Sequence, residues 1–146
     1  MVDFSKLLNE LIEIYAYTDK ETQFTVNVTQ DVPFRGDLFR IEVILGNLIS
    51  NAIKYQKLTE QNKKVDIAIV VTEEQVQIDI SDNGMGILNE HLEKIFTQFF
   101  KSKVHHGSGL GLFIVKEALN KIDGRIAVES DIDRGTTFKI TIPNAK

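Results

Sequence analysis

The chain has 146 residues, of which 42% are hydrophobic, and a formal charge of −4. This length suits a single domain with a buried core, which we expect over residues 1–146. The absence of cysteine excludes disulfides, thiolate metal sites and a thiol nucleophile. No apolar run approaches the roughly 20 residues of a membrane span, and an acidic chain without a basic patch is a poor candidate for nucleic-acid binding. We expect a cytoplasmic fragment that contacts neither membrane nor nucleic acid.

The first part of the chain predicts two amphipathic helices with a strand between them. Residues 3–17 place apolar side chains at the i, i+3, i+4, i+7 spacing of a helix, and Asp3 can cap it. Residues 23–29 alternate apolar and polar side chains, as a strand buried on one face does. Asp37 can cap a second helix that runs to about residue 57.

The second part predicts four strands and two more helices. The spacing of Leu92, Ile95, Phe96 and Phe99 predicts a short helix, and a later helix ends at Gly124. The strands are predicted at residues 65–71, 75–81, 126–128 and 138–142. Because the strands cluster in hairpins and do not alternate regularly with helices, we expect an α+β fold. Its form would be a two-layer α/β sandwich, with a mixed five-stranded sheet and helices on one face.

Three polar side chains share one stripe of the second predicted helix. Asn47, Asn51 and Lys54 stand at i, i+4 and i+7, beside the apolar face. The oxygen of an Asn side chain can ligate Mg²⁺, and Lys54 would add positive charge nearby. A solvated helix surface has the same composition, so this spacing alone leaves both interpretations open.

A second candidate segment follows the strand at residues 75–81. The carboxylate of Asp82 can accept a hydrogen bond from an exocyclic amine, and Gly84 and Gly86 would let a flat ring approach the backbone. This pattern fits a pocket for a nucleotide base. An Asp-Asn-Gly sequence is also a common turn, which is the alternative.

A third segment, containing Gly107, Gly109 and Gly111, precedes a predicted helix. Free backbone N–H groups and the positive end of that helix would suit phosphate oxygens. The segment lacks the Lys-Ser/Thr ending of a P-loop and follows a polar stretch where a dinucleotide-binding motif would follow a strand. A flexible linker is the alternative. Lys101 and Lys103 lie just before these glycines, where they could close over a triphosphate.

In this order the segments resemble the motifs of the GHKL ATP-binding superfamily, and most closely those of the catalytic domains of sensor histidine kinases. The resemblance covers nearly the whole chain. The segment NLISNAIKY at 47–55 is similar to the N box, and IFTQFFK at 95–101 is similar to the F box. The segments DNGMGI at 82–87 and GSGLGL at 107–112 are similar to the two glycine boxes. The segment GTTF at 135–138 is similar to the closing motif of the last hairpin.

The resemblance implies the Bergerat fold, with ATP and Mg²⁺ bound under a lid of residues 101–106 that is short for the family. It assigns Asp82 to the adenine amine, Asn51 and Asn47 to the metal, and Asn47 and Lys54 to catalysis. The implied nucleotide-binding residues are Asn51, Tyr55, Asp82, Gly84, Gly86, Ile87, Lys101, Gly107, Gly109, Leu110, Gly111 and Thr137.

One position indicates which reaction the chain would catalyse. Superfamily members that hydrolyse ATP or phosphorylate serine resemble one another in having a Glu general base four residues before the metal-binding Asn, where this chain has Asn47. An amide cannot take a proton at neutral pH, which favours transfer to a histidine over hydrolysis. A nucleotide-binding regulatory module and an anti-sigma-factor serine kinase are the alternatives.

The histidine acceptor is expected elsewhere. His91, His105 and His106 do not lie on a long helix hairpin, so the dimerisation hairpin with the phosphoacceptor is expected upstream, in a longer protein that serves a response regulator. This fragment is expected to be mainly monomeric and not to phosphorylate itself.

Overall fold

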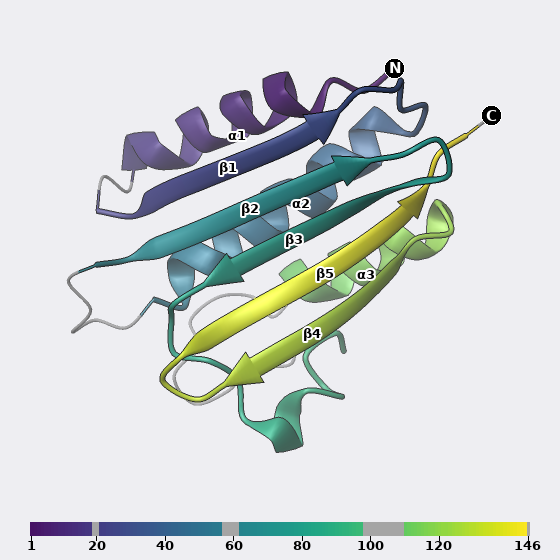
Figure 1. The fold of residues 1–146 in the computed structure, drawn as a ribbon. Coiled ribbons are helices and arrows are strands. Elements are labelled where there is room, and N and C mark those ends of the chain that lie inside the picture. The colour runs from purple at the N-terminus through teal and green to yellow at the C-terminus, as the bar shows by residue number, and fades with distance from the viewer. Residues whose placement is uncertain (19–20, 57–61, 98–109, 146) are drawn as a thin grey trace.

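The computed structural model describes residues 1–145 except 19–20, 57–61 and 98–109. Its five strands form one mixed sheet in the order β1-β2-β3-β5-β4 (Figure 1). β1 pairs parallel with β2, and the other three pairings are antiparallel. The strands are β1 (Gln23–Gln30), β2 (Lys64–Val71), β3 (Gln75–Asp82), β4 (Arg125–Asp131) and β5 (Gly135–Pro143).

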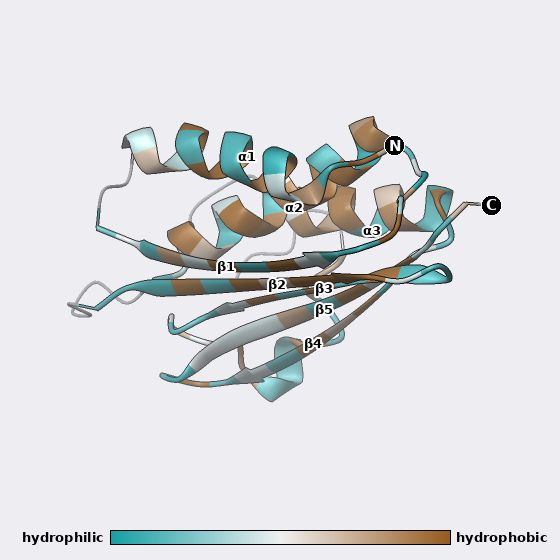
Figure 2. Ribbon diagram, turned by 45° about the horizontal axis from the view of Figure 1, so that its top comes forward, coloured by the Kyte–Doolittle hydropathy of each residue, from teal (hydrophilic) through white to brown (hydrophobic). Residues whose placement is uncertain are grey.

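Three α-helices cover one face of this sheet (Figure 2). They are α1 (Phe4–Thr18), α2 (Leu38–Lys54) and α3 (Gly111–Lys121). The expected α+β sandwich, with a mixed five-stranded sheet and helices on one face, is therefore confirmed. None of the described helices is both long and apolar enough to cross a bilayer.

The helices and the sheet share one apolar core. β2 and β3 alternate buried and more exposed residues, as strands covered on a single face do. α2 lies centrally in the helix layer and turns a continuous stripe of fully buried side chains to the sheet: Ile41, Ile44, Leu45, Leu48 and Ile49. Polar residues of α2 beside this stripe therefore lie at the border of the core.

Two helix starts confirm their predicted caps. A carboxylate oxygen of Asp3 accepts a hydrogen bond from the backbone N–H of Lys6 at 3.1 Å. Asp37 accepts from the N–H of Arg40, also at 3.1 Å, at the start of α2. Both bonds satisfy an N–H group that has no partner inside its helix.

The prediction of a short helix after residues 82–87 is wrong for the residues that the structure describes. A single 3-10 turn, η1 (Asn89–His91), is followed by further turns with bonds such as that from Thr97 N–H to the Lys94 carbonyl. The apolar spacing did identify buried side chains, since Ile95 is 5% exposed. Successive i→i+3 turns give nearly the same spacing as an α-helix, which explains the error. Phe99 lies outside the described residues.

Candidate nucleotide-binding site

Three polar residues lie side by side at one end of the sheet. In the strand register, Asp82 of β3 is opposite Thr136 of β5, and Thr136 is opposite Ser130 of β4. Residues opposite one another in a sheet point to the same face. Asp82, Thr136 and Ser130 therefore form a polar row on the face of the sheet that the helices cover, at the end of its apolar surface.

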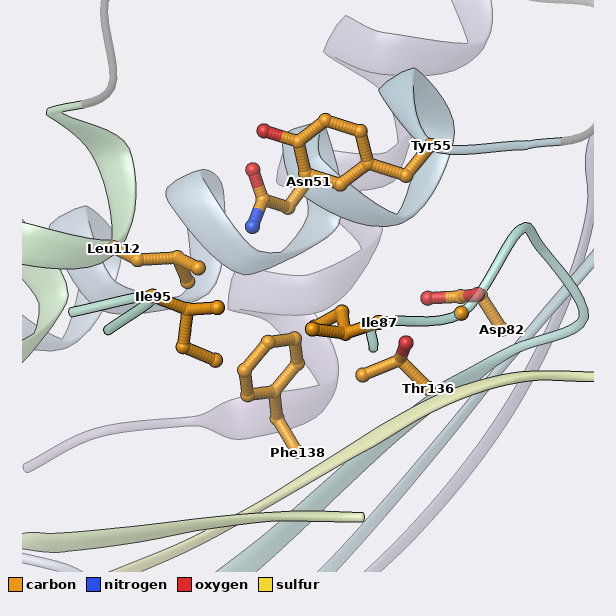
Figure 3. A pocket seen from close by; sticks show the side chains of 9 residues that line it. Asn51, Tyr55, Asp82, Ile87, Ile95, Leu112, Thr136 and Phe138 are labelled. Atoms are coloured by element: carbon orange, nitrogen blue, oxygen red, sulfur yellow. The ribbon is translucent and has the colours of Figure 1, made fainter. Parts of the chain in front are cut away.

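A cavity of about 30 Å³ lies between this row and the C-terminal turns of α2. Figure 3 shows Asn51 and Tyr55 projecting from α2 on one side, with Asp82 and Thr136 opposite and apolar side chains at the other end. The lining residues are Asn51, Tyr55, Asp82, Gly86, Ile87, Ile95, Leu112, Thr136 and Phe138. A space of this size holds about one water molecule, so a planar base requires the apolar side chains to move.

Asp82 is the only carboxyl among the described residues that line the cavity. One of its oxygens accepts a hydrogen bond from the N–H of Gly84 at 2.8 Å. Burial raises the pKa of Asp82 to about 6, and the backbone N–H groups of Gly84 and Thr136 partly oppose that rise. A partly buried carboxyl of this kind suits a ligand that donates a hydrogen bond to it.

Asn47 and Asn51 are two amide side chains that lie one turn apart on α2. Asn51 is 8% exposed and lines the cavity. The amide nitrogen of Asn47 donates to the carbonyl of Val43 at 2.7 Å, which leaves its oxygen directed toward α3. A Cβ built on Gly111 would lie 3.3 Å from that oxygen. The structure thus brings Asn47 and Gly111 together at the crossing of α2 and α3.

These amide oxygens fit a magnesium ion carried by a nucleotide. Mg²⁺ prefers oxygen ligands, keeps several waters and is often shared with substrate phosphates. No group of three His, Cys, Asp or Glu side chains that could hold a metal occurs in the described part of the chain. The chain would contribute Asn51 and Asn47, and phosphates and water the remaining ligands.

Tyr55 and Lys54 take different places at the end of α2. Tyr55 follows the last helical residue and lines the cavity, where burial raises the pKa of its hydroxyl. Lys54 is exposed and does not line the cavity. Its expected role at the phosphates remains a prediction.

The two glycines after Asp82 are required by backbone packing. A Cβ on Gly84 would overlap the carbonyl oxygen of Tyr55, to which the N–H of Met85 donates at 2.9 Å. Gly86 has φ +76°, and a Cβ there would overlap the carbonyl oxygen of Asp131. The segment is held between the end of α2 and the β4–β5 turn, so these glycines have a structural role in addition to any contact with a base.

The assignment of Thr137 needs correction. Its side chain lies on the opposite face of the sheet, where its hydroxyl oxygen is 2.8 Å from that of Ser81. Thr136, its neighbour in the chain, lines the cavity. Successive side chains of a strand point to opposite faces, so only one threonine of the GTTF motif can face the nucleotide site.

Sequence reasoning also missed Ile95, Leu112 and Phe138 as lining residues. The sequence did contain a signal for Thr136 and Phe138, because every second residue of β5 from Thr136 on is buried. The contribution of Ile95 depends on the turns after η1, which the sequence did not indicate. Ile95 and Leu112 close the apolar end of the cavity.

The start of α3 offers backbone donors near this site. Its N-cap residue, Leu110, makes no side-chain capping bond, and the first turn contains no acidic residue. Such a helix start can hold an anion with its N–H groups. The other residues expected there lie outside the described residues: Lys101, the lid at 101–106, His105, His106, Gly107 and Gly109.

Known proteins are similar to this chain in sequence and in fold. The family model described as Histidine kinase-, DNA gyrase B-, and HSP90-like ATPase matches residues 36–146. The signal transduction histidine-protein kinase BarA of Escherichia coli (strain K12) is 34% identical over 145 residues, which cover 90% of this chain and 15% of BarA. The probable C4-dicarboxylate sensor kinase of Bacillus subtilis (strain 168) is 36% identical over 115 residues, which cover 78% of this chain and 22% of that protein.

Among solved structures, the catalytic domain of histidine kinase ThkA is 28% identical, with a TM-score of 0.83, over 98% of this chain and 95% of that one. The chain belongs to the Histidine kinase-, DNA gyrase B-, and HSP90-like ATPase family. Within that family it matches the catalytic domains of sensor histidine kinases, which confirms the resemblance found in the sequence. The chain spans about one fifth of the length of the curated relatives that it matches.

Proposed function

We propose that this chain binds Mg·ATP and positions the γ-phosphoryl group for transfer to a histidine on a separate dimerisation domain. The observation that carries the proposal is the pairing of a partly buried carboxyl, Asp82, with a buried amide, Asn51, across one cavity. Support comes from the match to catalytic domains of sensor histidine kinases. A further neighbour, full-length ShkA, was solved in complex with AMPPNP and superimposes with a TM-score of 0.85 at 25% identity.

The base would enter at the sheet side of the cavity. Asp82 accepts a hydrogen bond from the exocyclic amine of adenine, and Thr136 replaces Thr137 as the threonine at this edge. Ile87 and Phe138 pack against the faces of the ring once the cavity widens. Burial of the ring between apolar side chains supplies affinity, and the polar edge supplies specificity.

The phosphates would extend toward the crossing of α2 and α3. The first N–H groups of α3, from Gly111 on, can donate to phosphate oxygens. Asn51 ligates the metal and Asn47 completes its surroundings, and bound Mg²⁺ neutralises phosphate charge during transfer. Lys54, Lys101, Gly107, Gly109 and Leu110 are proposed phosphate contacts from the family resemblance.

The amide of Asn47 favours phosphoryl transfer over hydrolysis as the main reaction. A general base must take a proton from the attacking group, which an amide does not do at neutral pH. The incoming histidine brings its own nucleophilic nitrogen, so the domain contributes placement and charge neutralisation. We therefore propose slow intrinsic ATP hydrolysis and no phosphorylation of the isolated chain.

The assembly around this domain is also a proposal. We propose that residues 1–146 act as one unit, because neighbours of catalytic-domain size cover 98% of the chain, including α1 and β1. In the cell the unit would work in the cytoplasm beside a histidine-bearing dimerisation domain and a response regulator. The fragment itself would be mainly monomeric.

Calorimetry and a phosphotransfer assay test the proposal together. ATP with Mg²⁺ is titrated into the wild-type chain and into Asp82→Ala, which should bind at least about tenfold more weakly because the hydrogen-bond partner of the base is lost. The wild-type chain is then incubated with labelled ATP and a purified histidine hairpin from a related kinase. Labelling of the hairpin supports the kinase assignment. Binding without labelling of any hairpin supports the regulatory-module alternative, and the absence of binding by a folded chain refutes the proposal.

A further inference from the structure

β1 forms one edge of the sheet, and no strand lies beyond it in the described part of the chain (Figure 1). The N–H of Gln23 donates to the carbonyl of Lys63 at 2.9 Å, in the direction of β2. The backbone groups of every second residue in a strand point to the same side. Those of Phe24, Val26 and Val28 therefore point away from β2, and none of the described residues bonds to them. The outer side of β1 presents a row of free N–H and C=O groups.

β1 also lacks the features that usually protect an edge strand. Its eight residues, QFTVNVTQ, include no charged residue and no proline. Its pairing with β2 is continuous, without a bulge. The opposite edge strand, β4, carries Arg125, Glu129 and Asp131. Charges, prolines and bulges keep an edge strand from pairing with other chains, so β1 is the edge that can accept a further strand.

A cleft of about 600 Å³ lies beside the carboxyl end of β1. Figure 1 shows the N-terminus of the chain next to this end of the strand. The apolar residues that line the cleft are Met1, Val2, Val28, Val32 and Pro33. Because the backbone groups of Val28 point to the free edge, the cleft and the edge form one continuous surface. Apolar side chains of an added strand would find contacts there.

The charges of the cleft are acidic. Asp3 and Asp31 line it, and none of its described lining residues has a basic side chain. Asp3 already accepts the N–H of Lys6 as a helix cap. Asp31 forms no ion pair within the described part of the chain. A ligand with a Lys or Arg side chain near Asp31 would complement this charge.

We infer that the edge of β1 and this cleft bind an extended segment of a partner protein, which adds to the sheet as a further strand. The segment pairs antiparallel with β1, since antiparallel pairing gives the stronger ladder. It alternates apolar and polar residues, because the inward side chains of Phe24, Val26 and Val28 are only half-buried. A basic residue in its N-terminal half lies beside Asp31. No described residue lines both this cleft and the nucleotide cavity, so the inference does not depend on nucleotide binding.

Amide hydrogen exchange, followed by NMR, tests the inference on the chain itself. The probe is an eight-residue peptide that alternates valine with threonine and carries an arginine near its N-terminal end. Without peptide, the N–H groups of Thr25 and Asn27 should exchange slowly and those of Val26 and Val28 rapidly. An excess of peptide should slow the exchange of Val26 and Val28 at least about tenfold and leave Thr25 and Asn27 unchanged. A peptide with proline at its centre lacks a ladder donor and should not have this effect.

A charge-reversal variant tests the acidic side of the cleft. Asp31→Lys should weaken binding of the arginine peptide about fivefold, because an attraction is replaced by a repulsion. Glu117→Lys makes the same change of charge at an exposed position of α3 and should leave binding unchanged. Affinities are measured from the NMR shifts of folded protein, so a loss of stability does not imitate the effect.

Three results would overturn the inference. The first is unchanged exchange at Val26 and Val28 when the peptide is added to the folded chain. The second is equal binding of the arginine peptide and a version with glutamate in its place. The third is exchange at these two residues that slows with rising protein concentration alone, which would show that a second copy of the chain occupies the edge.

Discussion

Asp82 is expected to destabilise the domain at neutral pH, and Asp82→Asn should reveal this. Burial raises the pKa of Asp82 from 3.8 to about 6. A carboxyl with a higher pKa in the folded state than in the unfolded state favours folding below about pH 4, and this contribution is lost as pH rises through about 6. Replacing the carboxyl with an uncharged amide of the same shape removes the cost of burying the charge.

The size of the change in stability follows from the change in the pKa of Asp82. A difference of about two pKa units corresponds to roughly 3 kcal/mol in the free energy of unfolding. The introduced amide retains one acceptor oxygen for the N–H of Gly84, and loss of the second acceptor, toward Thr136, costs about 1 kcal/mol. We therefore expect Asp82→Asn to be about 2 kcal/mol more stable than the wild-type chain at pH 8, and slightly less stable at pH 4.

Urea denaturation of both proteins across this pH range measures the difference directly. Carboxylates other than Asp82 are common to both proteins and cancel in the comparison. Asp66→Asn, at an exposed position on the outer face of β2, is the control and should change stability by less than about 0.5 kcal/mol at every pH. If Asp82→Asn were equally destabilising at pH 4 and pH 8, the argument from burial would be refuted.

The same variant connects stability with ligand binding. An ionised carboxyl is the better acceptor for an amine, so ATP should bind more weakly to the wild-type chain as pH falls through about 6. Asp82→Asn should bind ATP weakly, without this additional pH dependence. The phosphates of ATP titrate equally in both experiments, so the comparison isolates Asp82. A residue that binds ligand at the expense of stability is typical of functional sites.

Three more predictions follow from the packing of the site and of α2. Asn51→Ala should remove the Mg²⁺ dependence of ATP binding, which calorimetry with and without the metal would show. Gly86→Ala should cost about 2 kcal/mol or more in urea denaturation, because φ is +76° and the added methyl group overlaps the Asp131 carbonyl. Gly46→Ala should instead stabilise the domain by about 0.5–1 kcal/mol, since Gly46 is inside α2 and its Cβ would lie 3.5 Å from the Tyr15 hydroxyl; a loss of stability there would contradict this.

The local pattern of the sequence determined the family, the five strands and the three α-helices, and it failed for the turns around η1. Helices with one apolar face and strands with period two must bury those faces together, which is why the two-layer architecture followed from periodicity alone. The caps at Asp3 and Asp37 were also local, because a capping side chain bonds to N–H groups in the next turn of the same helix. The ordered glycine and asparagine motifs indicated the ATP-binding family before any contact was visible.

Tertiary structure alone decided which side chains meet. The register of β3, β5 and β4 placed Asp82, Thr136 and Ser130 in one row and turned Thr137 to the opposite face. Pairing between distant strands has no local signature, and a shift of one residue would exchange the two faces. The raised pKa of Asp82 and the hydrogen bond from the N–H of Ile87 to the Ser130 hydroxyl also depend on neighbours far away in the sequence. They arise only when the loop after β3, the β4–β5 turn and the end of α2 pack against one another.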